Sequence, residues 1–205
     1  MLFRSLIEEN YEICGVFTKP DKPQGRKRII TPPPVKVFAL EHGLKVFQPE
    51  KLKIQETADL IESLNPDAIA VVAYGKILPK NIIDMPKYGC INVHGSLLPH
   101  YRGAAPIQWS IINGDKVTGI STMFMDEGLD TGDILLQTKV SINDDETSEE
   151  LKKRLSVIGA ELLIKTLKEL ENGTLERIKQ DDSQATLSPP LDKITGDIDW
   201  NKPAQ

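Results

Sequence analysis

The chain has 205 residues, of which 40% are hydrophobic and 27% are charged, and its formal net charge is −5 at pH 7. This composition predicts a globular chain with a packed core and excludes a wholly disordered one. The acidic balance excludes nucleic-acid binding through bulk charge, so any site for RNA has to be a local basic patch.

The cysteines and histidines bear on the cellular compartment of the protein and on whether it binds a metal. Cys14 and Cys90 stand far apart in apolar runs, which favours two reduced core thiols in a cytoplasmic protein. Two unpaired cysteines and three scattered histidines give no zinc-binding pattern, so no metal is expected. No apolar run approaches the roughly 20 residues that span a bilayer, and Glu8 and Glu9 interrupt the N-terminal apolar stretch. We therefore expect no membrane contact and no signal peptide.

The first half of the chain alternates predicted helices with predicted strands. Helices are expected over residues 2–9, 35–42 and 57–64, and strands over 13–18, 45–47 and 68–73. A loop rich in proline and basic residues fills residues 19–34. The run over 68–73, Ala-Ile-Ala-Val-Val-Ala, lacks alternation, which is typical of a parallel strand covered on both faces.

The second half continues the alternation. A turn and a short helix are expected over residues 77–83, helices over 104–112 and 147–170, and strands over 89–94, 118–124 and 134–140. Thr147 and Glu150 form a capping-box pattern at the start of the last helix. Residues 181–205 are polar and rich in proline and aspartate, which favours an extended tail or linker after a domain over 1–180. The alternation predicts an α/β fold: an open, mostly parallel sheet with helices on both faces.

The strand over 89–94 ends on Asn92 and His94. Side chains two residues apart on a strand share a face, and ligands of such sheets sit beyond the carboxyl ends of the strands. An amide can donate to a developing oxyanion, and an imidazole can change protonation near neutral pH. The bland alternative is that both side chains only bond a neighbouring loop; the adjacent Gly95 and the Ser-Leu-Leu-Pro turn favour a catalytic role in acyl transfer.

The glycine-rich loop 126–133 contains the candidate carboxylates for the same site. Asp130 is our candidate proton acceptor, although Asp126, Glu127 and Asp133 compete for the role and an aspartate between glycines is often only a turn residue. The local sequence leaves that choice open.

Two further segments are candidates for binding. The first holds five basic residues against Asp21 alone, which fits either a solvated loop or an arm that contacts phosphates; they are Lys19, Lys22, Arg26, Lys27 and Arg28. The second, Lys76-Ile77-Leu78, follows the apolar strand, and its apolar residues fit either the core or a flat apolar slot. No glycine-rich phosphate loop follows any predicted strand, which argues against nicotinamide and nucleoside-triphosphate sites.

Taken together, these stretches resemble the methionyl-tRNA formyltransferase family over nearly the whole chain. The resemblance is carried by Thr-Pro-Pro-Pro-Val-Lys at 31–36, Val-Ala-Tyr-Gly-Lys-Ile-Leu-Pro at 72–79, Asn-Val-His-Gly-Ser-Leu-Leu-Pro at 92–99, Arg-Gly-Ala-Ala-Pro-Ile at 102–107 and the loop 125–135. The broader group of enzymes that use 10-formyltetrahydrofolate shares the Asn, His, Ser-Leu-Leu-Pro and Asp elements. The Arg-Gly-Ala-Ala-Pro-Ile run and the proline-rich basic loop narrow the match to the tRNA enzymes.

The resemblance implies a Rossmann-like catalytic domain that transfers a formyl group from 10-formyltetrahydrofolate to the α-amino group of initiator methionyl-tRNA. We expect a monomer, located in the cytoplasm. It implies Asn92, His94 and Asp130 as the catalytic set and the basic loop as the tRNA contact. The folate-binding residues that it implies are Lys76, Ile77, Leu78, Ser96, Leu97, Leu98, Pro99, Met125 and Leu129.

Against that family, the sequence starts at the helix after the usual first strand, and residues 196–200 resemble the linker to a C-terminal β-barrel domain. The expectation is a catalytic domain without that strand and without the barrel. The alternatives are hydrolysis of the same donor, formylation of an amino sugar or another small amine such as a purine precursor, and an inactive, truncated remnant that only binds.

Overall fold

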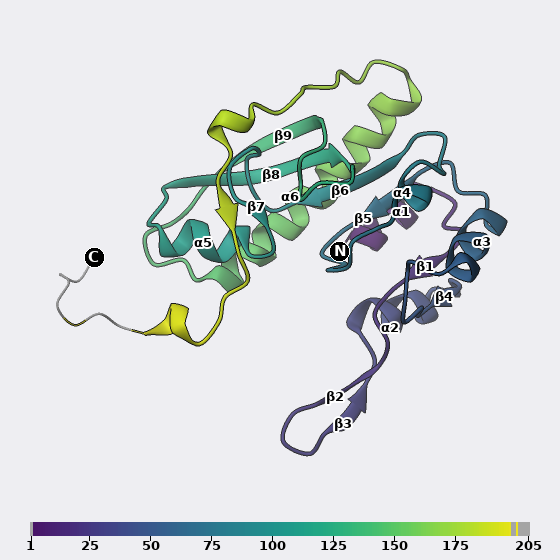
Figure 1. Ribbon diagram of the computed structural model, residues 1–205, viewed down its shortest axis with the longest axis horizontal. Coiled ribbons are helices and arrows are strands. Elements are labelled where there is room, and N and C mark those ends of the chain that lie inside the picture. The colour runs from purple at the N-terminus through teal and green to yellow at the C-terminus, as the bar shows by residue number, and fades with distance from the viewer. Residues whose placement is uncertain (1, 198–199, 201–205) are drawn as a thin grey trace.

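A four-stranded sheet forms the centre of the computed structural model, which describes residues 2–197 and residue 200 (Figure 1). Its strand order is β5–β6–β8–β9. The bounds are Ile69–Val71 for β5, Cys90–His94 for β6, Val117–Phe124 for β8 and Ile134–Ser141 for β9. The β5–β6 pair is parallel, whereas the β6–β8 and β8–β9 pairs are antiparallel.

The strand directions correct one part of the prediction. The fold is α/β as expected, but the central sheet is mixed rather than mostly parallel. Strands β8 and β9 are consecutive and joined only by the loop 125–133, and strands joined without a crossover helix pair antiparallel.

Three two-stranded sheets complete the strand set of the described residues. Strand β1 (Val16–Phe17) runs parallel to β4 (Val46–Phe47), and β7 (Arg102–Gly103) runs parallel to β10 (Leu187–Ser188). Strands β2 (Lys22–Gln24) and β3 (Ile29–Thr31) pair antiparallel as a hairpin that projects from the rest of the chain (Figure 1). The segment 19–34, expected as a loop, therefore contains a β-hairpin.

The helices begin and end close to the predicted positions. They are α1 (Leu2–Glu8), α2 (Pro34–Glu41), α3 (Gln55–Ser63), α4 (Lys80–Ile83), α5 (Pro106–Ile112) and α6 (Ser148–Glu171), with 3₁₀ turns at Asp182–Gln184 and Ile194–Gly196. The predicted capping box is confirmed: Thr147 Oγ1 accepts from the Glu150 amide, and the Glu150 carboxylate accepts from the Thr147 amide. No helix within the described ranges combines the length and the apolar character needed to cross a bilayer.

Alternate residues of β6 face opposite layers. Ile91 and Val93 pack toward the long helix α6, whereas Cys90 packs with apolar residues of α3 and α4. Helices thus lie on both faces, as predicted. Because side chains alternate along a strand, Asn92 and His94 share the face of Cys90, away from α6.

The strand over 68–73 differs from its expectation. It was predicted to be covered on both faces, but Ala70 is exposed and Val72 is 40% exposed. In the described structure β5 is the end strand of its sheet and pairs only with β6. A strand at that position keeps only part of its surface buried, although its sequence is uniformly apolar.

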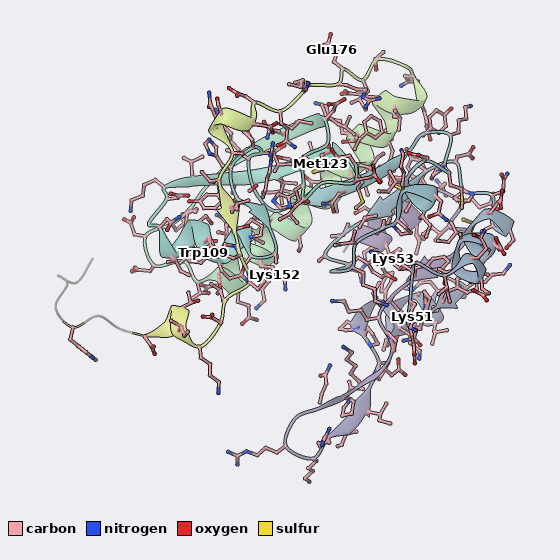
Figure 2. All side chains as sticks on the ribbon, in the orientation of Figure 1. Lys51, Lys53, Trp109, Met123, Lys152 and Glu176 are labelled. Atoms are coloured by element: carbon pink, nitrogen blue, oxygen red, sulfur yellow. The ribbon has the colours of Figure 1, made fainter. Side chains whose placement is uncertain are left out.

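The C-terminal stretch packs onto the domain for part of its length. Residues 187–188 pair with β7, and Trp109 of α5, labelled in Figure 2, donates a hydrogen bond to the carbonyl of Pro189 (2.8 Å). The expected linker motif at 196–200 lies partly outside the described residues, since 198–199 and 201–205 are not among them. The boundary at residue 180 stays a prediction.

Candidate active site

The carboxylate of Asp130 joins the ends of two strands. Asp130 lies in the loop between β8 and β9, with φ of 53°. Its Oδ1 lies 3.3 Å from the Asn92 amide nitrogen, and its Oδ2 lies 3.6 Å from Nδ1 of His94. The backbone amide of Gly103 also donates to Oδ2, at 2.9 Å. The structure therefore brings the three residues predicted from the sequence into one cluster.

Burial makes this cluster suited to stabilising charge on a bound substrate. The side chains of His94 and Asp130 are 6% and 15% exposed. In a site shielded from water, hydrogen bonds and charges act more strongly than at the surface. One N–H of the Asn92 amide faces Asp130, and the second is available to a ligand, because an amide nitrogen carries two donors.

The backbone of Tyr101 orients the ring of His94. Nε2 of His94 lies 2.9 Å from the Tyr101 carbonyl oxygen. A carbonyl oxygen can only accept, so Nε2 carries a proton, and Nδ1, which faces Asp130, is the ring nitrogen where a proton can be gained or lost. Neither of these backbone groups, the Tyr101 carbonyl and the Gly103 amide, is predicted from the sequence. A backbone carbonyl leaves no signature in a side-chain pattern.

Two of the competing carboxylates of the loop, Asp126 and Asp133, have other partners. Asp126 accepts hydrogen bonds from the Gly128 amide and the Thr131 hydroxyl, which closes the loop on itself. Asp133 forms an ion pair with Arg177 at 2.9 Å. Asp130 is the carboxylate that the loop directs toward β6.

Two of the predicted folate-binding segments meet beside β6. Leu78 and Met125 belong to the same apolar cluster as Cys90, on the face that also carries Asn92. Ile77, next to Leu78 in sequence, is 73% exposed, and Leu129, four residues after Met125, is 59% exposed. Two exposed apolar side chains on segments that flank a polar cluster are suited to hold a flat, largely apolar ring.

Other predicted folate-binding residues lie in the interior or are already engaged. Lys76 donates to the carbonyls of Pro49 and Glu50, both at 2.8 Å. Ser96 is fully buried, and its hydroxyl donates to the His100 carbonyl (2.6 Å). Leu98 is 3% exposed and packs against Met123 and Ile134, while Leu97 and Pro99 are half-buried. These side chains shape the turn behind the cluster.

The basic loop divides into two parts. Lys22 lies on β2, and Arg26, Lys27 and Arg28 form the exposed turn of the hairpin. Lys19 lies outside the hairpin, with its ammonium group against Gly75, near the predicted folate-binding segment. The structure thus brings four of the five basic residues together on one projection and places the fifth elsewhere.

The negative charge of Asp21, the single acidic residue of this loop, is neutralised by a residue that lies outside the loop. Asp21 forms an ion pair with Lys36 at 2.8 Å and accepts a hydrogen bond from Gln48. These two partners hold the pKa of the Asp21 carboxyl below its ordinary value. The hairpin itself therefore presents only positive charge.

Neither a thiol nor a metal site accompanies the cluster in the described residues. Burial raises the pKa of the Cys90 thiol to about 12, so this neighbour of Asn92 on the strand is not a nucleophile near neutral pH. Among the residues that the structure describes, no three His, Cys, Asp or Glu side chains gather as a metal would require.

Comparisons with known proteins point to one family. The family model described as formyl transferase matches residues 2–167. A methionyl-tRNA formyltransferase of Acetivibrio thermocellus is 54% identical over 200 residues, which is 98% of this chain. The chain spans 64% of the length of that relative and of several others of the same name.

Solved structures show the same fold. A 4-N formyltransferase from Francisella tularensis aligns with a TM-score of 0.72 at 24% identity, covering 99% of this chain and 77% of that one. A formyltransferase from Anoxybacillus kamchatkensis, solved with a formamido-sugar nucleotide and tetrahydrofolate, aligns with a TM-score of 0.61 at 24% identity over 85% of both chains.

Proposed function

Because the chain belongs to the formyl transferase family, we propose that it transfers a formyl group from 10-formyltetrahydrofolate to the α-amino group of initiator methionyl-tRNA. The observation that carries this proposal is the cluster of Asn92, His94 and Asp130, on which an amide, an imidazole and a carboxylate converge. The likeness to relatives named for that reaction supports the choice of acceptor.

The three side chains divide the work of acyl transfer. The free N–H of the Asn92 amide donates to the formyl oxygen, whose negative charge grows as the amine attacks the formyl carbon. Nδ1 of His94, once protonated, adds positive charge beside that oxygen. Asp130 accepts, directly or through a water molecule, the proton that the α-ammonium group of the acceptor loses before its amine attacks. The tetrahedral intermediate then collapses: the bond between the formyl carbon and N10 of the donor breaks, and N10 takes up the second proton that the attacking nitrogen loses as tetrahydrofolate leaves. No covalent bond to the enzyme is required.

The binding surfaces suit the two substrates. The exposed Ile77 and Leu129 offer apolar contact to the pterin ring of the donor. The hairpin turn with Arg26, Lys27 and Arg28 offers positive charge to the phosphates of the tRNA acceptor stem. A small acceptor such as an amino sugar would have no use for a projecting basic hairpin, which favours a nucleic-acid acceptor.

A transfer assay with competing acceptors tests the proposal. Radiolabelled formyl groups are followed from 10-formyltetrahydrofolate to methionyl-tRNA, to amino-sugar nucleotides and to water. We expect transfer to methionyl-tRNA, and a loss of about 10²–10³ in rate for Asn92→Ala, the cost of removing one oxyanion donor. Transfer only to water or to the sugar would contradict methionyl-tRNA as the acceptor. Folate binding without any turnover would contradict the proposal that the chain is an enzyme.

A further inference from the structure

Gln180, which lies beyond the last long helix, is buried next to the catalytic cluster. It is 7% exposed. Its Nε2 donates to the carbonyl oxygens of Asp130 (2.8 Å) and Gly132 (2.7 Å). Its Oε1 accepts from Nε and Nη2 of Arg102, at 3.0 and 2.8 Å. Every donor and acceptor of this amide is therefore used, and the amide orientation is fixed because a guanidinium can only donate.

These bonds hold the loop in the conformation that aims Asp130 at β6. Asp130 has a positive φ of 53°, which side chains with a Cβ adopt at a cost. Such a conformation persists only where the surroundings fix it, and the carbonyl of Asp130 itself is one of the two that Gln180 holds. The Gly132 carbonyl, two residues further on, is the other. Gln180 thus fixes the backbone on both sides of Thr131.

The same segment also supports His94 from behind. Ser188 is fully buried, and its hydroxyl donates to the Tyr101 carbonyl at 2.9 Å. That carbonyl is the one that accepts from His94 Nε2. Pairing of β10 with β7 places Gly103, whose amide donates to Asp130. Gln180 and Ser188 therefore contact the backbone groups that position the carboxylate and the imidazole, respectively.

We propose that Gln180 is a positioning residue for formyl transfer, which holds Asp130 through the carbonyls of residues 130 and 132. This inference rests on the proposed function. The rival explanation is that Gln180 serves only to neutralise the buried Arg102, which also forms an ion pair with Asp182 (2.7 Å).

Two substitutions separate these explanations. Gln180→Glu keeps the size of the side chain and strengthens its contact with Arg102, but places a carboxylate oxygen against two carbonyl oxygens. Gln180→Met keeps the volume and removes all four hydrogen bonds. If Gln180 acts through the loop, both substitutions lower kcat by about 10–100-fold, since small misplacements of a reacting group are costly. KM for the folate donor stays within threefold. If Gln180 serves Arg102 alone, Gln180→Glu keeps the wild-type kcat.

The control variant is Gln184→Ala, an exposed glutamine on the same segment, which keeps the wild-type kcat.

A second readout does not depend on activity: hydrogen exchange of the Gly103 amide, which donates to Asp130, accelerates at least tenfold in Gln180→Glu and stays slow in Gln184→Ala. The two claims can fail separately. If the wild-type protein transfers no formyl group but Gly103 exchange still accelerates in Gln180→Glu, the proposed function is wrong, whereas the contact by which Gln180 holds Asp130 is supported.

Three results would overturn the proposal. The first is a kcat within threefold of wild type for Gln180→Glu. The second is Gly103 exchange that is unchanged in that variant. The third is a Gln180→Glu protein that remains unfolded at every temperature, because Gln180 would then be a determinant of folding; if only Gln180→Met fails to fold, Gln180→Glu decides alone.

Discussion

His94 donates from Nε2 to the carbonyl oxygen of Tyr101 across 2.9 Å, and this single bond decides which ring nitrogen is free to react. The bond fixes Nδ1 on the side of Asp130, 3.6 Å from its Oδ2. A backbone carbonyl cannot change its charge, so it holds the ring through a proton-transfer cycle without competing for the proton.

This relationship predicts different outcomes for two substitutions of His94. In His94→Gln the new amide can reach the Tyr101 carbonyl, but the ring nitrogen that carries positive charge beside the formyl oxygen is lost; we expect a folded protein with transfer reduced by about 10²–10³, the usual cost of removing one group that stabilises the oxyanion. His94→Ala should lose as much activity and also some stability, because the Tyr101 carbonyl loses a partner. Single-turnover rates and thermal unfolding separate the two effects. Turnover near wild type in His94→Gln would refute a role for Nδ1.

The hairpin predicts a salt-dependent contact with RNA. Replacing Arg26, Lys27 and Arg28 with glutamine should raise KM for methionyl-tRNA and reduce the slope of log KM against log salt by about one unit per lost phosphate contact. The donor's KM should not change. The matched control replaces three exposed lysines away from the hairpin, Lys139, Lys152 and Lys153, and so removes the same charge; Lys152 is labelled in Figure 2. Equal slopes in the two variants would count against the hairpin as the contact.

The two cysteines predict selective thiol labelling. Cys90 is 1% exposed and its thiol has a pKa of about 12, whereas Cys14 is partly exposed. At pH 8 only about one Cys90 in ten thousand would carry a thiolate, so the folded protein should react with iodoacetamide at Cys14 alone. Mass spectrometry of the labelled protein locates the adducts, and Cys90 should react once denaturant is added. Fast labelling of Cys90 in the native protein would show that the face of β6 opens.

Much of this architecture could be predicted from local patterns. The capping box placed the start of α6, and the spacing of Asn92 and His94 placed both on one face. The strand directions could not be predicted in the same way, because an apolar run does not say whether its neighbour runs parallel. The β2–β3 hairpin was not predicted, because its strands are short and exposed and stand among proline and basic residues instead of alternating apolar ones. The roles of Gln180 and Ser188 depend on contacts with residues 48 to 87 positions away, which no local pattern reports.

Replacement of Gly119 on β8 is predicted to lower the stability of the fold. A Cβ there would overlap the Thr138 carbonyl oxygen and the Leu97 side chain, so Gly119→Ala should destabilise the fold by about 1–3 kcal/mol. Gly196→Ala is the control, since a Cβ at that position meets open space. Urea unfolding of both variants measures the difference. Equal midpoints would mean that both the Leu97 side chain and the β9 backbone at Thr138 move aside without cost.

The central claim is that the carboxylate of Asp130 works with Asn92 and His94 on one formyl carbon. Asp130→Asn tests it most directly, because the substitution keeps the shape and still accepts from Gly103 while it removes the charge and the capacity to take a proton. We predict that the single-turnover rate of transfer to methionyl-tRNA falls at least about 100-fold with the unfolding temperature nearly unchanged. A rate within threefold of wild type in the folded variant would contradict the account.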